Sequence, residues 1–235
     1  MTTTTDARPS LWMKLTRYSF LKKKRSTRNL ERLCREYATD KRTLVVHSED
    51  VNYRPYFPNA FSVTKRPDKP ADMHVDLYYT DLSNIASESY EVILCTGLLE
   101  HLPQPEQLVR EFHRILKPGG ELIISASAVF SIHEAPNDFY HFTPFSFRRL
   151  FEQWTGFRML RGSSQPFETI AILLQRILIQ CRVFPLVRPL VEMLCLALPL
   201  LDKSIITQYS TAGRMETTFE IDSMLPSNIQ AVVVK

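Results

Sequence analysis

The stretch YEVILCTGLLEHLPQPEQLVREFHRILKPGGELIISAS, residues 90–127, decides the fold of this chain. It opens with the apolar run 90–95 and closes with the apolar run 121–126, and each run has the length of a buried strand. Between them, residues 105–116 carry apolar side chains at helical spacing behind an initial proline. The Lys-Pro-Gly-Gly sequence at 117–120 predicts the end of that helix and a tight turn. A strand, a helix and a second strand in this order predict parallel pairing in a covered sheet.

The same alternation of strands and helices continues on both sides of this stretch. We expect helices at residues 26–39 and after Thr143-Pro144, and strands at residues 43–46, 60–64, 75–79, 157–160 and 228–234. The sequence therefore predicts an α/β fold with a Rossmann-like, doubly wound, mostly parallel sheet. Ligands of such folds bind beyond the carboxyl ends of the strands, where the strand order reverses.

Residues 166–202 interrupt this alternation with two apolar helical segments. The longest uncharged piece, residues 193–201, is far too short to span a bilayer. We divide the chain into a basic flexible arm (1–25), a main domain (26–165), an inserted pair of apolar helices (166–202), and a connecting loop with the final strand of the same domain (203–235). The inserted pair is expected either to pack on the domain or a partner subunit, or to lie in a membrane interface.

Positive charge gathers near the start of the chain. The 235 residues carry a formal net charge of +4, and residues 1–42 alone hold twelve Lys and Arg against four Asp and Glu. A basic arm of this kind either serves solubility or is attracted to an anionic surface. With the apolar helices of 166–202, it predicts peripheral contact with a membrane. Nucleic acid is disfavoured because few aromatic side chains stand among these charges.

The cysteines and the polar first residues bear on location. The four cysteines lie far apart in the sequence, which excludes a disulfide scaffold and fits a reducing compartment. Residues 1–10 are polar and lack the apolar run of a secretory signal. We therefore expect a cytoplasmic protein, with the inner face of the membrane as its site of peripheral contact.

Residues 90–127, together with HEAPNDFYHFTPFSFRRLFEQWTGF at 133–157, resemble the class I S-adenosylmethionine-dependent methyltransferases, in particular the type-11 group. The resemblance rests on a strand followed by Leu99-Glu100-His101, a proline-rich turn, a helix and Leu-Lys-Pro-Gly-Gly. It implies S-adenosylmethionine as cofactor. It also implies methyl transfer to a hydroxyl or an amine of a small or glycan-type acceptor.

Two departures from the family pattern stand at the cofactor site that this resemblance implies. The family follows its first strand with a glycine-rich turn, whereas no glycine precedes Gly97 here and residues 47–52 read HSEDVN. The family ends its second strand with an acid that binds the ribose hydroxyls, whereas Lys65 and Arg66 stand here. The alternative interpretation is a catalytically inactive binding module with the methyltransferase fold.

The residues that follow the strands are the candidate site residues. By resemblance, the cofactor contacts are His47, Glu49, Asp81, Leu82 and Thr96. The candidate catalytic residues are Glu100, His101, His133 and Asp138, because a neutral histidine can take a proton from a hydroxyl while a carboxylate orients it. The competing structural roles are a helix cap for Glu100 and His101 and a lid for residues 133–141. The histidines show no metal-ligand spacing, so we expect no metal.

Overall fold

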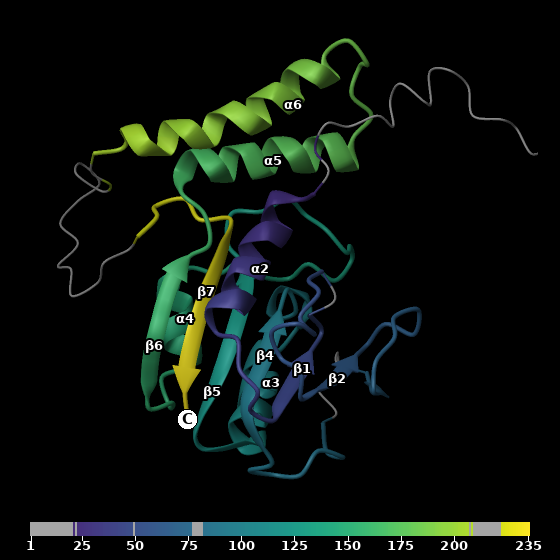
Figure 1. Cartoon of the computed structure of the whole chain (residues 1–235), viewed down its shortest axis with the longest axis vertical. Helices are drawn as coiled ribbons and strands as arrows, with labels where there is room; N and C mark the ends of the chain where they lie inside the picture. Colours follow the sequence, from purple (N-terminus) through teal and green to yellow (C-terminus); the bar gives the residue numbers. More distant parts are fainter. Residues whose placement is uncertain (1–20, 22, 49, 77–81, 207, 209–221) are drawn as a thin grey trace, which may run out of the picture.

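The computed structural model describes residues 21, 23–48, 50–76, 82–206, 208 and 222–235. Its strands are β1 (Thr43–Val46), β2 (Ala60–Thr64), β3 (Met73–His74), β4 (Tyr90–Thr96), β5 (Leu116–Ser127), β6 (Gly156–Gly162) and β7 (Asn228–Val234). Its helices are α2 (Arg25–Glu36), α3 (Pro105–Ile115), α4 (Pro144–Leu150), α5 (Pro166–Gln180) and α6 (Arg188–Ala197), with 3₁₀ turns η2 (Leu99–His101) and η3 (Leu198–Ser204). The predicted α/β fold is confirmed (Figure 1).

The strands form one sheet in the order β3-β2-β1-β4-β5-β7-β6. Strands β1 to β5 pair in parallel, and β7 runs antiparallel to both β5 and β6. The strand order reverses between β1 and β4, because the chain builds outward from β1 to β3 and then returns to the other side. That reversal places the carboxyl ends of β1 and β4 at the position where such sheets bind ligands.

Helices cover both faces of the sheet, with α2 on one face and α3 and α4 on the other (Figure 1). The alternation of strand side chains explains the two layers of core. Leu44 and Val46 of β1 belong to the cluster that contains the α3 and α4 side chains, while Val45 belongs to the cluster under α2. The sheet is therefore buried on both faces, as its almost continuously apolar strands predict.

The local signals at α3 and α4 act as the sequence predicts. Pro105 occupies the first turn of α3, where its missing N–H costs nothing, and Phe112 is fully buried in the core below. The Thr143 side chain accepts a hydrogen bond from the Ser146 N–H, and the Ser146 side chain accepts one from the Thr143 N–H. These two bonds form a capping box at the start of α4.

Two predicted boundaries are wrong. The third strand is the short pair Met73–His74, although the Val75 N–H still donates to the Thr64 carbonyl at 3.0 Å; residues 77–79 of the predicted strand lie outside the described residues. The expected turn at 117–120 belongs instead to β5, which begins at Leu116. The chain end explains this difference, because the Lys235 N–H donates to Gly120 and the Lys235 carbonyl accepts from Gly119.

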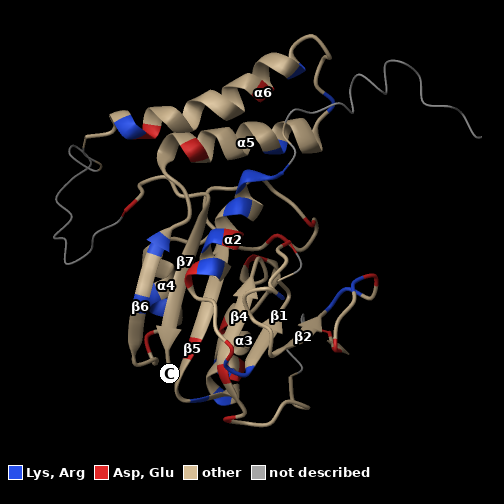
Figure 2. Ribbon diagram, viewed as in Figure 1, with Lys and Arg blue, Asp and Glu red and all other residues tan. Residues whose placement is uncertain are grey.

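Helices α5 and α6 form a hairpin that lies across the carboxyl ends of the parallel strands (Figure 1). The N–H groups of Phe167 and Glu168 donate to the Asp202 carboxylate at 2.8 and 2.9 Å, which fastens the start of α5 to η3. Few charged residues lie on the two helices (Figure 2). Within the described part of the chain, every helix is too short or too polar to cross a membrane.

Candidate active site

A cavity of about 370 Å³ lies at the carboxyl ends of β1, β4 and β5. His47 follows β1, Thr96 ends β4, and Ser125 and Ser127 end β5. The start of α2 and residues of α5 line the opposite side, the latter through Arg176 and Gln180. The cavity therefore occupies the reversal of strand order, where we expect the ligand of this fold.

Three of the candidate catalytic residues meet in this cavity. One ligand-type atom from each of Glu100, His101 and His133 lies within 4.8 Å of the other two. The His101 and His133 rings make an edge contact with centroids 4.7 Å apart. Glu100 is 1% exposed, and its Oε1 accepts hydrogen bonds from the Ser127 N–H and hydroxyl at 3.2 and 2.7 Å. Side chains from η2 and from the loop after β5 thus form one cluster.

Hydrogen bonds fix the orientation of both imidazoles. His101 Nδ1 lies 2.7 Å from the Asn137 carbonyl, and His133 Nδ1 lies 3.1 Å from the Ser131 carbonyl. Because a carbonyl oxygen can only accept, each Nδ1 carries a proton, and in the neutral ring each Nε2 presents a lone pair. Burial, together with the neighbouring His101, lowers the pKa of His133. The neutral form of His133 is therefore favoured, and in that form its Nε2 can accept a proton.

The fourth candidate, Asp138, supports this cluster from the same loop. Its carboxylate is 4% exposed and accepts a hydrogen bond from the His133 N–H at 2.9 Å. It lies 3.6 Å from His133 Nδ1 and 3.8 Å from His141 Nε2. The structure thus brings together all four residues that the sequence suggested as catalytic.

Only some of the predicted cofactor contacts lie at the cavity. His47 and Thr96 line the cavity. Leu82 is 1% exposed within the core cluster and does not line the cavity, so its cofactor contact stays a prediction. Glu49 and Asp81 lie outside the described residues.

His47 supplies the backbone conformation that a glycine supplies in the family pattern. Its φ is +50°, in the left-handed region that residues other than glycine rarely adopt. The first turn after β1 is therefore formed without glycine. The side chain at this turn is therefore an imidazole, which is 7% exposed and lines the cavity.

A carboxylate also reaches the end of β2, although no acid follows that strand in the sequence. Glu134, from the loop after β5, lies 3.3 Å from the Lys65 ammonium. Burial opposes ionisation of Glu134, but Lys65 and His101 outweigh it and hold the pKa of this carboxyl below its usual value. Glu134 lines both the cavity and a neighbouring cavity of about 750 Å³ beside Lys65 and His74. The sequence does not predict this contact at the end of β2, because Glu134 lies 69 residues from Lys65 along the chain.

Unpartnered polar atoms show that the cavity suits a polar ligand. Thr96 Oγ1, Glu100 Oε2 and Ser125 Oγ are buried and have no hydrogen-bond partner among the described residues. A buried polar atom left without a partner costs roughly 1–3 kcal/mol, so a ligand that pairs with these atoms is favoured. With Glu134 at the end of β2, the residues present fit a cofactor that carries an amino-acid group and ribose hydroxyls.

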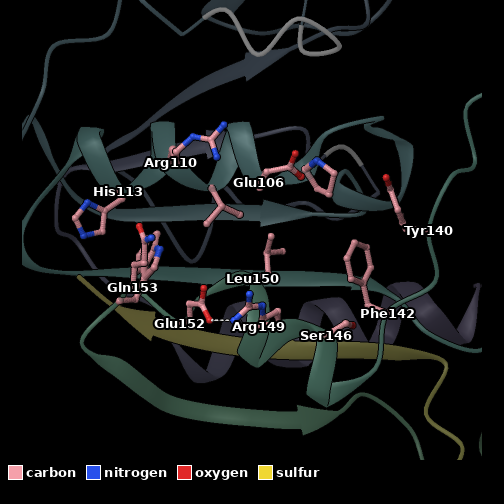
Figure 3. A pocket seen from close by; sticks show the side chains of 13 residues that line it. Glu106, Arg110, His113, Tyr140, Phe142, Ser146, Arg149, Leu150, Glu152 and Gln153 are labelled. Carbon is pink, nitrogen blue, oxygen red and sulfur yellow. Dashed lines mark hydrogen bonds and ion pairs between the residues drawn. The ribbon is translucent and has the colours of Figure 1, made fainter.

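A separate cavity of about 570 Å³ opens between α3 and α4 (Figure 3). Arg110 and His113 reach it from α3, and Arg149 and Glu152, which form an ion pair, reach it from the region of α4. The predicted site residues do not line it. This cavity lies on the face of the sheet that α3 and α4 cover, away from the strand ends. It is therefore not the candidate active site.

The fold and the position of the cavity define a class I methyltransferase architecture. Residues 50–124 match the family described as a methyltransferase domain. The crystal structure of a SAM-dependent methyltransferase from Archaeoglobus fulgidus superposes with a TM-score of 0.52 at 10% identity and covers 89% of this chain and 93% of that one. Residues 50–124 are thus similar to a methyltransferase domain, and the chain has the fold of the S-adenosylmethionine-dependent methyltransferases.

Among curated proteins, a ubiquinone biosynthesis O-methyltransferase of Pseudomonas syringae pv. tomato is 40% identical over 45 residues, which are 19% of each chain. The chain spans less than a third of the length of the curated relatives that it matches. A solved structure named as the [4+2]-cyclase SpnF shares the fold with a TM-score of 0.54 at 13% identity and covers 94% of this chain and 84% of that one. The fold therefore accommodates more than one chemistry.

Proposed function

We propose that this protein transfers a methyl group from S-adenosylmethionine to a hydroxyl of a small-molecule acceptor. The observation that carries this proposal is the pair of imidazoles and the buried carboxylate in the cavity at the β1–β4 reversal. The curated relative is named an O-methyltransferase, which supports a hydroxyl as the acceptor. An amine and a glycan-type acceptor remain within the proposal.

Different residues of the cavity would accept the proton, orient the imidazoles and bind the cofactor. When bound, S-adenosylmethionine supplies an electrophilic methyl group. His101 and His133 present Nε2 lone pairs that accept the proton of the acceptor, while Asp138 and two backbone carbonyls hold the rings in place. Thr96 and Ser125 pair with the polar end of the cofactor, and Glu134 replaces the missing acid at the end of β2. The Phe130 ring offers an apolar wall for the acceptor. The Arg176 guanidinium lies over this ring, 4.9 Å from its centroid.

Acceptor screening tests this function. The purified chain is incubated with S-adenosylmethionine and panels of phenols, sugars and amines, and release of S-adenosylhomocysteine is measured. We expect turnover with a hydroxyl acceptor. Binding of the cofactor without turnover on any panel would instead support the non-catalytic binding module, which the glycine-free turn at His47 favours.

We also propose that α5 and α6 dock on an anionic lipid surface. Large apolar side chains remain exposed on α6 and in the segments on either side of it, among them Leu190 at 54%, Leu186 at 81% and Leu200 at 66%. Lys23, Lys24 and Arg28 are exposed at the start of α2, and the Arg25 N–H donates to Gln175 of α5 at 2.9 Å. Positive charge thus lies beside the apolar helices, a combination that favours anionic membranes. Such docking would place the protein at the inner face of the membrane.

Vesicle sedimentation tests the docking surface. Burial of one leucine side chain contributes roughly 1.5–3 kcal/mol, so Leu186→Glu with Leu190→Glu should lower affinity for phosphatidylglycerol vesicles by at least about 100-fold. Phe145→Glu, which changes a half-exposed aromatic residue on α4, should leave binding unchanged. Equal sedimentation of the double variant and the wild type would exclude these helices as the anchor.

A further inference from the structure

We propose that Glu100, His101 and His133 bind a divalent transition-metal ion. The three residues supply two imidazole nitrogens and one carboxylate oxygen, which lie within 4.8 Å of one another. This two-histidine, one-carboxylate set is a recurrent donor set for zinc and for iron(II) with open positions for further ligands. The spacing of the histidines along the sequence does not predict it, because the fold joins η2 to the loop after β5.

The hydrogen bonds around the cluster leave one donor atom on each residue for the metal. Asn137 and Ser131 accept the Nδ1 protons of His101 and His133, so in the neutral rings the Nε2 lone pairs are available as ligands. The proposed function uses these same lone pairs to accept a proton, so a bound ion takes over the activation of the acceptor hydroxyl, whose proton then passes to solvent. Glu100 uses Oε1 to bind Ser127, and its Oε2 is buried without a hydrogen-bond partner among the described residues. Backbone carbonyls behind histidines and a hydroxyl behind a carboxylate are the outer contacts that orient metal ligands.

Burial makes the carboxylate an independent indication of a cation. Glu100 is 1% exposed, and a buried carboxylate oxygen without a partner is costly unless a proton or a cation neutralises it. Around one ion with bonds of about 2.0–2.2 Å, donor atoms stand roughly 3–4 Å apart, so closing the set requires a contraction of about 1 Å. Two imidazoles exclude a preference for magnesium, which takes oxygen ligands, and favour zinc or cobalt over manganese.

Metal binding is tested on the full chain without a histidine tag and without cofactor or acceptor. The chelator-treated protein is titrated with Zn²⁺ against a chromophoric chelator and with Co²⁺ by visible absorption. We expect one ion per chain, tighter binding of Zn²⁺ than of Mn²⁺, and no competition by Mg²⁺. Since neither S-adenosylmethionine nor turnover enters this assay, its failure is distinguishable from failure of the proposed methyl transfer.

Matched variants locate the ion. His101→Gln and His133→Gln should each weaken Zn²⁺ binding by at least the roughly 10- to 100-fold that loss of an outer contact costs, and Ser127→Ala should weaken it within that range. His113→Gln, on α3 outside the cavity, should bind as the wild type does. Unchanged affinity in both His101→Gln and His133→Gln would overturn the site. Should either variant fail to fold, the wild-type titration decides, because the absence of a saturable Co²⁺ spectrum would equally overturn it.

Discussion

Replacing His133 with alanine is expected to lower kcat for methyl transfer by about 100- to 10,000-fold, the range that a positioned proton acceptor contributes. The imidazole lies against His101, with its Nδ1 proton held by the Ser131 carbonyl and its backbone N–H held by Asp138. These contacts fix the orientation of the ring and leave Nε2 available as a proton acceptor or as a ligand of the proposed metal. The measurement is steady-state release of S-adenosylhomocysteine with the acceptor found by screening.

Two readouts separate this chemical role from a structural one. The Kd for S-adenosylmethionine should change little in His133→Ala, because the proposed cofactor contacts are made by other residues. His113→Ala provides the control. His113 belongs to α3, packs edge-on against Trp154 and lies outside the cavity. Equal kcat values for His133→Ala and the wild type would remove His133 from the chemistry.

Replacing Phe147 with alanine is expected to lower the free energy of unfolding by about 3–5 kcal/mol. Phe147 is fully buried on α4, and its ring makes edge contacts with Phe142 and Phe151 at centroid distances of 5.4 and 5.7 Å. Truncation would remove these contacts and leave a cavity between α4 and the sheet. Urea denaturation followed by circular dichroism measures the change.

Phe145 on the same helix provides a matched control. It is 50% exposed, so Phe145→Ala should change the free energy of unfolding by no more than about 0.5 kcal/mol. The comparison holds helix propensity and residue type constant and varies only burial. Similar losses in the two variants would show that α4 does not pack on the sheet as described.

Local signals predicted most of the fold because each depends on neighbouring residues. The apolar runs of β1, β4 and β7, the proline at the start of α3 and the capping box of α4 act within a few positions of the sequence. The KPGG segment at 117–120 could not be predicted in the same way. Its extension of β5 depends on Lys235, a residue more than a hundred positions away.

The site shows the same division. Position after a strand suggested His47, Thr96, Glu100 and His101, because parallel strands bring their carboxyl ends to one edge. The contact of Glu134 with Lys65 and the approach of His133 to Glu100 depend on the path of the loop after β5. A loop path is set by packing and by hydrogen bonds to distant backbone, which the spacing of residues in a sequence does not encode.

Calorimetric titration of the purified chain with S-adenosylmethionine and S-adenosylhomocysteine measures whether the cavity at the β1–β4 reversal binds the cofactor. The account predicts one site per chain with a Kd in the micromolar range for both ligands, because His47 replaces the glycine of the turn and Glu134 replaces the acid of β2. Glu134→Gln should weaken that binding by roughly 10- to 100-fold, the value of about 1.5–3 kcal/mol for a charge-assisted hydrogen bond. Absence of heat and of any thermal shift at millimolar ligand would contradict the account and leave a methyltransferase fold without its cofactor.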